Sequence, residues 1–323
     1  MATAGASVLA TDCGLGFVAP LLLLLACLQA LWIPLQDAWR LRHPRARERY
    51  LACLRVSAVD AEIGLMTLPL GFAVLSSAFM HLQADIAVGA QILLALAWLF
   101  SLLLLFRLLW SLRRFGIAWP KLSGAWFLLP AAIFALAAAT SAVIASQRAL
   151  GYVLVLLAAL AGTLLYVVVA VLAILRVRRH GLTGVPQAPW WIAMGCAGFA
   201  ALALGQAQRW EPLSPGARNM LLAAMAGMLG LALLLLVPVL LASIDFLLRR
   251  CQFCGPAVWP PTFSTAIFAL ACLQGGRVLH FDDLVNLGHL AGWAALLLWS
   301  GSMAWTLGRG VWMRWQRRAW FPA

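Results

Sequence analysis

Nine apolar runs divide this sequence, and every second segment between them is basic. About 20 apolar residues in a helix cross the hydrocarbon core of a bilayer, and each run is close to that length. Only 10% of the 323 residues are charged, whereas soluble domains carry about 25%. The sequence therefore predicts an all-α fold, a polytopic membrane bundle in one integral domain over residues 1–323. We expect spans at 14–36, 61–80, 86–109, 125–145, 150–174, 189–208, 220–247, 256–274 and 284–307.

The basic residues orient these spans. Lys and Arg gather in cytoplasmic loops of membrane proteins, and alternate loops of this chain carry 19 of its 23 Lys and Arg. The other four are Arg148, Arg209, Arg218 and Arg277. We therefore predict an N-terminus outside and a C-terminus inside. The net charge of +13 follows from this topology, so no nucleic-acid partner is expected.

Composition alternates between successive spans. The second, fourth, sixth and eighth contain Pro, Gly, Ser and Thr, whereas the third, fifth, seventh and ninth are blocks of Leu and Val. Small residues allow helices to approach closely, and Leu suits a lipid-facing surface. The pattern predicts helical hairpins, each an inner helix followed by an outer one. Polar or small residues of the inner spans are then candidates for lining a path, and we single out Thr67, Thr140, Ser141, Gly195, Thr262 and Ser264.

The eighth span is the least suited to face lipid. It begins with three prolines near residue 256 and is interrupted by Ser and Thr, with Phe263 about two turns from its start. Pro is tolerated in the first turn of a helix, and irregular backbone at membrane depth is tolerated only against protein or a water-filled cavity. We expect this span to be an inner helix.

Three short patterns in the inner spans resemble one family. The eighth span reads Trp-x-x-Thr-Phe-Ser over residues 259–264, the sixth reads Pro-Trp-Trp-Ile-x-x-Gly over 189–195, and the fourth reads Trp-x-Leu-Leu-Pro over 126–130. Together they resemble the tellurite-resistance/dicarboxylate transporter family, which includes the plant slow-type anion channels. The resemblance covers roughly residues 60–310.

The resemblance implies a specific architecture. Members of that family are similar to bundles of ten helices in five hairpins, often trimeric, with five inner helices around a pore that a phenylalanine plugs. Phe263 falls on the plug position. This chain has nine predicted spans, and its first resembles the family's second, so the expectation is a ring of four inner helices. A homotrimer is a possible assembly.

Other chemistry has less support in the sequence. The ten acids lie near span ends or in loops rather than at mid-membrane, so the sequence shows no carboxylate placed for a proton relay. The seven Cys form no disulfide framework, and Cys251-x-x-Cys254 remains open as a metal or redox pair. The five His show no spacing for haem. We expect no catalytic residue, no cofactor and no metal.

The predicted function is transport of small anions across the cell inner membrane, by a channel or a carrier. Tellurite, sulfite, halide or nitrate, and dicarboxylates are all open as solutes. Phe263 is the predicted gate, and selectivity is expected from pore radius, backbone and hydroxyl dipoles and a positive inner field. The alternative is a membrane anchor or assembly subunit of a redox complex. The lipid bilayer is the expected partner in both cases.

Overall fold

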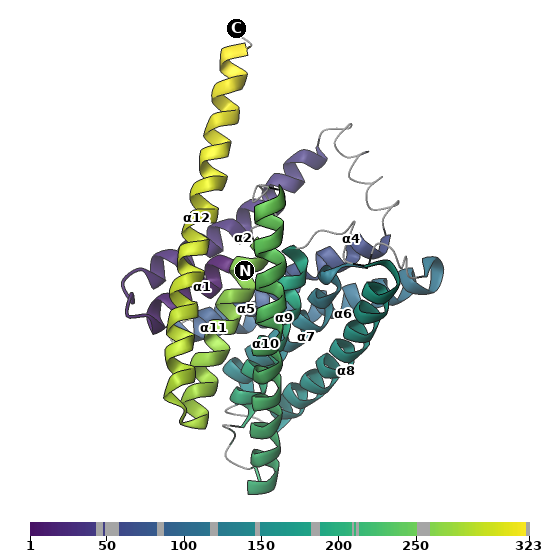
Figure 1. Ribbon diagram of the computed structural model, residues 1–323, viewed down its shortest axis with the longest axis vertical. Coiled ribbons are helices and arrows are strands. Elements are labelled where there is room, and N and C mark those ends of the chain that lie inside the picture. Colours follow the sequence, from purple (N-terminus) through teal and green to yellow (C-terminus); the bar gives the residue numbers. More distant parts are fainter. Residues whose placement is uncertain are drawn as a thin grey trace.

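The fold is a bundle of helices, seen in a computed structural model of the chain (Figure 1). The structure describes residues 1–42, 48, 58–82, 87–116, 122–145, 149–181, 188–208, 210, 213–250 and 259–320, and no strand occurs among them. Seven described helices are long and apolar enough to cross a membrane. Two shorter apolar helices, Ala19–Leu31 and Trp191–Ala207, coincide with the other two predicted spans.

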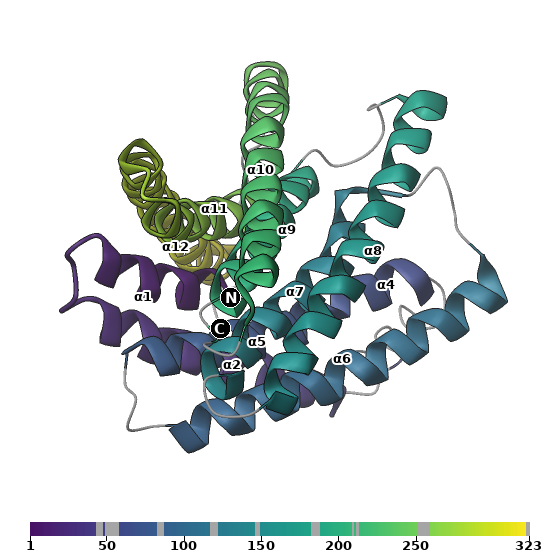
Figure 2. The same ribbon diagram turned by 90° about the horizontal axis from the view of Figure 1, so that it is seen from below.

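The chain is organised as five hairpins, each an inner helix followed by an outer one. The inner members are α1 (Ala2–Asp12), α5 (Thr67–Leu82), α7 (Leu128–Thr140), α9 (Trp191–Ala207) and α11 (Trp259–Leu279). The outer members are α2 (Ala19–Leu41), α6 (Ala87–Phe115), α8 (Ala149–His180), α10 (Pro215–Arg250) and α12 (Asp282–Trp320). In Figure 2, α6 and α8 form one edge of the bundle and α7 lies between them.

Burial separates the two sets of helices. About 83% of the apolar segment of α7 and 72% of that of α11 are buried, whereas the corresponding share is 17% in α10 and 28% in both α6 and α12. The outer helices expose Leu, Val and Ile side chains, as a surface in contact with lipid does. The predicted alternation of inner and outer helices is therefore present in the structure.

The inner helices are interrupted, and proline explains two of the interruptions. Pro69 has no N–H to donate to the carbonyl of Leu65, and the short helix α4 (Ala58–Leu65) is separated from α5 by a turn at Met66. Pro130 likewise cannot donate to the carbonyl of Trp126, which lies in the 3₁₀ turn η3 (Gly124–Phe127) before α7. Another 3₁₀ turn, η5 (Ala188–Trp190), precedes α9, and a π turn, η4 (Ser141–Ala145), follows α7.

The ring of inner helices has five members, which corrects the expectation of four. α1 packs against α5 on one side and α11 on the other, and the contacts α5–α7, α7–α9 and α9–α11 close the ring. Residues 1–13 were predicted to lie outside, before the first span, but Ala4, Ser7 and Leu9 are completely buried in the bundle. With 11 residues, α1 is about 16 Å long at 1.5 Å per residue, half the length of a span. This is why a search for full-length apolar runs passes over it.

Hydrogen bonds hold α1 in this place. The Nε1–H of Trp299 on α12 donates to Oγ1 of Thr3 at 3.1 Å, and that hydroxyl donates to Oε1 of Gln29 on α2 at 2.7 Å. One buried hydroxyl of α1 thus ties the helix to both of its outer neighbours.

Candidate functional site

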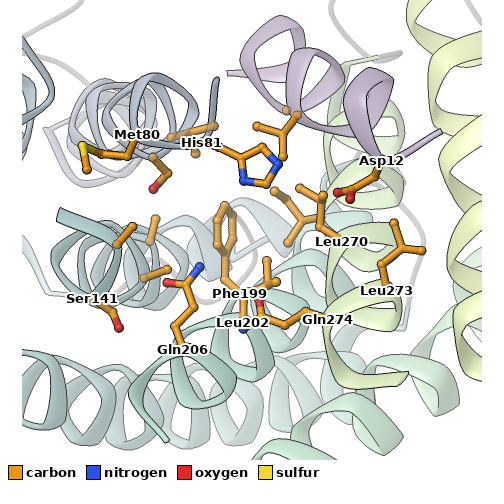
Figure 3. A pocket seen from close by; sticks show the side chains of 18 of the residues that line it. Asp12, Met80, His81, Ser141, Phe199, Leu202, Gln206, Leu270, Leu273 and Gln274 are labelled. Atoms are coloured by element: carbon orange, nitrogen blue, oxygen red, sulfur yellow. The ribbon is translucent and has the colours of Figure 1, made fainter. Parts of the chain in front are cut away.

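The five inner helices enclose a cavity of about 470 Å³. Most of its lining residues lie in the C-terminal halves of these helices, and we call the end of the cavity at the helix C-termini the mouth. Its described lining residues are Gly5, Val8, Asp12, Val74, Ser77, Met80, His81, Ala135, Ala138, Ser141, Ala142, Phe199, Leu202, Gln206, Ala207, Trp210, Ile267, Leu270, Leu273, Gln274 and Arg277. Figure 3 shows part of this lining, with Phe199 near the centre of the view.

Phe199 lies at the end of the cavity opposite the mouth and packs against a second aromatic ring. Phe199 on α9 lines the cavity, and its ring centroid lies 5.7 Å from that of Phe263 on α11, with the ring planes tilted by 45°. Phe263 is only 8% exposed and precedes the lining residue Ile267 by one helical turn. Phe199 is therefore the ring at this end of the cavity, which we call the floor, and Phe263 packs against it from outside the lining; we call Phe199 and Phe263 the ring pair.

The wall between floor and mouth carries several polar groups. Ser77 and His81 come from α5, Ser141 from η4, Gln206 from α9 and Gln274 from α11. Within the described part of the chain, the buried atoms Gln206 Oε1 and Gln274 Nε2 have no hydrogen-bond partner. Buried polar atoms normally find partners in protein or water, so both amide side chains have unused hydrogen-bonding capacity beside the cavity.

An ion pair lies at the mouth. Nη2 of Arg277, in the last turn of α11, is 3.1 Å from Oδ1 of Asp12, the last residue of α1. Burial, and then the neighbouring Asp12 carboxylate, raises the pKa of the Cys13 thiol above its ordinary value. Among the described residues, no group of three or more His, Cys, Asp or Glu is placed to hold a metal ion. Cys251 and Cys254 lie outside the described residues.

Of the seven predicted site residues, Ser141 is the one found among the described lining residues of the cavity. Two of the others face outer helices instead. Thr140 Oγ1 accepts a hydrogen bond from Trp98 Nε1 of α6 at 3.0 Å, and Thr262 Oγ1 lies 3.3 Å from Ser302 Oγ of α12.

Gly195 and Ser264 lie together between α9 and α11. A Cβ atom added at Gly195 would be 2.8 Å from Ser264 Oγ and 3.0 Å from its Cα, so the missing side chain permits close approach of the two helices. Thr67 begins α5 and donates to the carbonyl of Gly64 at 2.8 Å. Phe263 is not among the described lining residues, and it reaches the cavity only through its contact with Phe199.

Sequence reasoning missed Phe199, Gln206, Gln274 and the Asp12–Arg277 pair. Phe199 sits in a run of small residues, Gly-Cys-Ala-Gly-Phe-Ala-Ala, and a lone large ring in such a run is a usable signal for an inner position. Arg277 carried another signal, since it is one of the four basic residues on the side that the positive-inside rule leaves poor in charge.

Comparison with known proteins gives one result that covers the chain. Neither the curated proteins nor the solved structures include a match to it. The family model described as the voltage-dependent anion channel, SLAC1, matches residues 1–307, which include all five inner helices, α1 among them. The chain therefore belongs to the voltage-dependent anion channel family.

Proposed function

We propose that this protein passes small anions across the cell inner membrane along the axis of its five inner helices. The observation that carries the proposal is the cavity, which all five inner helices line and which has the ring pair at its floor. Membership of an anion-channel family supports the class of solute. A polytopic bundle with lipid-type outer helices supports the location.

The ring pair acts as the gate in this proposal. An ion that leaves the cavity through the floor has to pass between inner helices where Phe199 and Phe263 fill the space. An apolar constriction blocks an ion sterically and by excluding water, with no need for a fixed charge. Displacement of one or both rings then connects the cavity to the opposite end of the bundle.

The direction of the inner helices favours an anion beyond the floor. All five helices begin at the end away from the mouth, so the partial positive charges of their N-termini converge there. Free N–H groups at helix N-termini bind anions readily. The loops on that side are also the basic ones in the sequence, so a solute that passes the ring pair enters a region of positive potential.

The test is anion flux into liposomes that hold the purified protein, compared with protein-free liposomes. A cysteine placed in the cavity, Leu202→Cys, should make the flux sensitive to a membrane-impermeant thiol reagent, because Leu202 lines the path. The matched control is Leu234→Cys on α10, where the side chain is 74% exposed on the outer surface. Flux no greater than in protein-free liposomes would refute the proposed function. Equal inhibition of both variants would refute the assignment of the path.

A further inference from the structure

The two side chains of the Asp12–Arg277 ion pair differ in their exposure. The Arg277 side chain is 52% exposed, whereas that of Asp12 is 14% exposed and lines the same cavity. The contact joins one guanidinium nitrogen to one carboxylate oxygen. A guanidinium has five N–H donors in a planar fork, so the contact with Asp12 uses a small part of its donor capacity.

Helix direction places partial negative charge at this end. The C-terminal ends of α1, α5, α9 and α11 surround the mouth, and each helix C-terminus carries a partial negative charge. An anion that enters here meets that potential unless a positive group offsets it. Among the described residues that line the cavity, Arg277 is the single Lys or Arg.

A second donor lies on the same helix. Gln274 precedes Arg277 by three residues, so both side chains lie on one face of α11 and line the cavity. The Gln274 amide nitrogen has no hydrogen-bond partner among the described residues. A cation and an unused amide donor one turn apart are the groups that a carboxylate or a planar oxyanion requires.

We propose that Arg277 and Gln274 form an oxyanion-binding subsite at the mouth. While no solute is bound, the Asp12 carboxylate pairs with the Arg277 guanidinium at the position that a bound oxyanion would take. Asp12 thus takes the place of the carboxylate or nitrate that the subsite receives from solution. The subsite selects oxyanions over halides, because two coplanar oxygens can accept from the guanidinium fork together. It deepens the transport function proposed above and rests on it for its role.

Binding can be measured separately from flux. Purified protein in detergent is titrated with sodium nitrate, sodium acetate or sodium chloride at constant ionic strength, and the thermal midpoint is followed, since a ligand that binds the folded state raises it. Nitrate and acetate should stabilise the wild type at lower concentration than chloride. Arg277→Gln should weaken nitrate binding about tenfold, the equivalent of ~1.4 kcal/mol. Asp12→Asn should tighten it.

The matched control is Arg218→Gln. Arg218 lies in the first turn of α10, an exposed residue at the same end of the bundle, but it is not among the described lining residues of the cavity. It should bind nitrate as the wild type does. Because Arg277→Gln leaves Asp12 without its partner, the double variant with Asp12→Asn removes both charges together and should show the same weak binding.

Each result decides the proposal. Equal nitrate binding in Arg277→Gln and Arg218→Gln, no preference of the wild type for nitrate over chloride, or unchanged binding in Asp12→Asn would overturn the subsite. Nitrate binding that depends on Arg277 in a protein without flux would keep the subsite and refute transport. Flux with nitrate binding that does not depend on Arg277 would keep transport and refute the subsite.

Discussion

Truncation of Phe263 separates a gate from a packing residue. Removal of a Phe side chain from a filled core costs about 3–5 kcal/mol, the sum of lost contacts and the void that remains. Phe263 is 8% exposed and its recorded ring contact is Phe199. Tilted ring pairs of this kind contribute about 0.5–1.5 kcal/mol beyond the area they bury. If Phe263 only packs, Phe263→Ala loses the full amount and gains no flux.

The gate interpretation predicts a smaller loss of stability and a gain of flux. Truncation would open the floor, and a cavity of this size with several polar groups in its wall admits water, so the space left by the ring joins the cavity instead of forming a dry void. The cost should then fall to about 3 kcal/mol or below. A lowering of the barrier to ion passage by ~1.4 kcal/mol raises the flux about tenfold.

Phe134→Ala is the matched control for this experiment. Phe134 on α7 is completely buried, and its ring lies 2.9 Å from a Cβ built on Gly162 of α8, so it packs between an inner and an outer helix. Its truncation should destabilise the protein by about 3–5 kcal/mol without raising flux. Phe199→Ala should raise flux, and a double-mutant cycle with Phe263→Ala should show coupling of the two rings.

The assay is flux per folded molecule in liposomes, together with thermal stability in the same lipid. Flux that is unchanged or lower in Phe263→Ala, with a loss of stability equal to that of Phe134→Ala, would refute the gate. Flux that rises equally in all three variants would show general loosening of the bundle instead of removal of a plug.

Three further predictions test the fold around the site. Gly195→Ala should destabilise the protein by about 1–3 kcal/mol, because the added Cβ is too close to the side chain and the backbone of Ser264. Gly227→Ala in α10, where the added Cβ has no neighbour within 4 Å, should be neutral or slightly stabilising in thermal unfolding. The raised pKa of Cys13 leaves less thiolate near pH 8 than an ordinary thiol has, so its labelling by iodoacetamide should be slow and should accelerate as the pH rises. Asp12→Asn removes the carboxylate charge that contributes to the raised pKa, and it should speed labelling of Cys13 at fixed pH. An epitope inserted between Leu279 and Asp282 should be accessible from outside the cell and one after Ala323 from the cytoplasm, and accessibility of both from the same face would contradict the predicted topology.

Composition was a good guide to which helices are inner. A lipid-facing helix gains nothing from Pro, Gly or Ser, so their presence in alternate spans marks helices that pack against other protein. Pro69 and Pro130 also mark where the inner segments are broken, because the loss of one N–H donor acts locally and can be read from the sequence. The burial of α7 and α11 follows this pattern.

The direction in which a single side chain of an inner helix points could not be predicted in the same way. Thr140 and Thr262 are polar and were therefore predicted to line the path, yet each contacts a group on an outer helix, Trp98 and Ser302. A helix with small or apolar residues on every side has no amphipathic stripe that defines its rotation about its own axis. Packing against neighbouring helices therefore decides which residues point toward the cavity. Phe199 and Phe263 come together through such packing of α9 on α11.

The helix α1 shows a different limit of sequence reasoning. It has 11 residues, most of them Ala, Gly, Ser and Thr, which is too short for the length expected of a membrane span. Its place depends on neighbours far along the chain, since Thr3 is bonded to Gln29 and Trp299, and Asp12 to Arg277. A segment that is stable only through tertiary contacts has no local signature, and it supplies one wall of the cavity and the acid of its mouth.

The five inner helices are parallel to one another, so their dipoles add along the axis instead of cancelling. At the end where they begin, this potential is positive, and the basic loops of the sequence reinforce it with many residues. At the mouth the helix C-termini contribute a negative potential, and among the described lining residues Arg277 is the single basic side chain, other than His81, that opposes it. Attraction of anions at one end is thus shared among many groups, while at the other it depends on one guanidinium. Substitution of a single loop arginine should therefore change flux little, whereas substitution of Arg277 changes the entry of the anion itself.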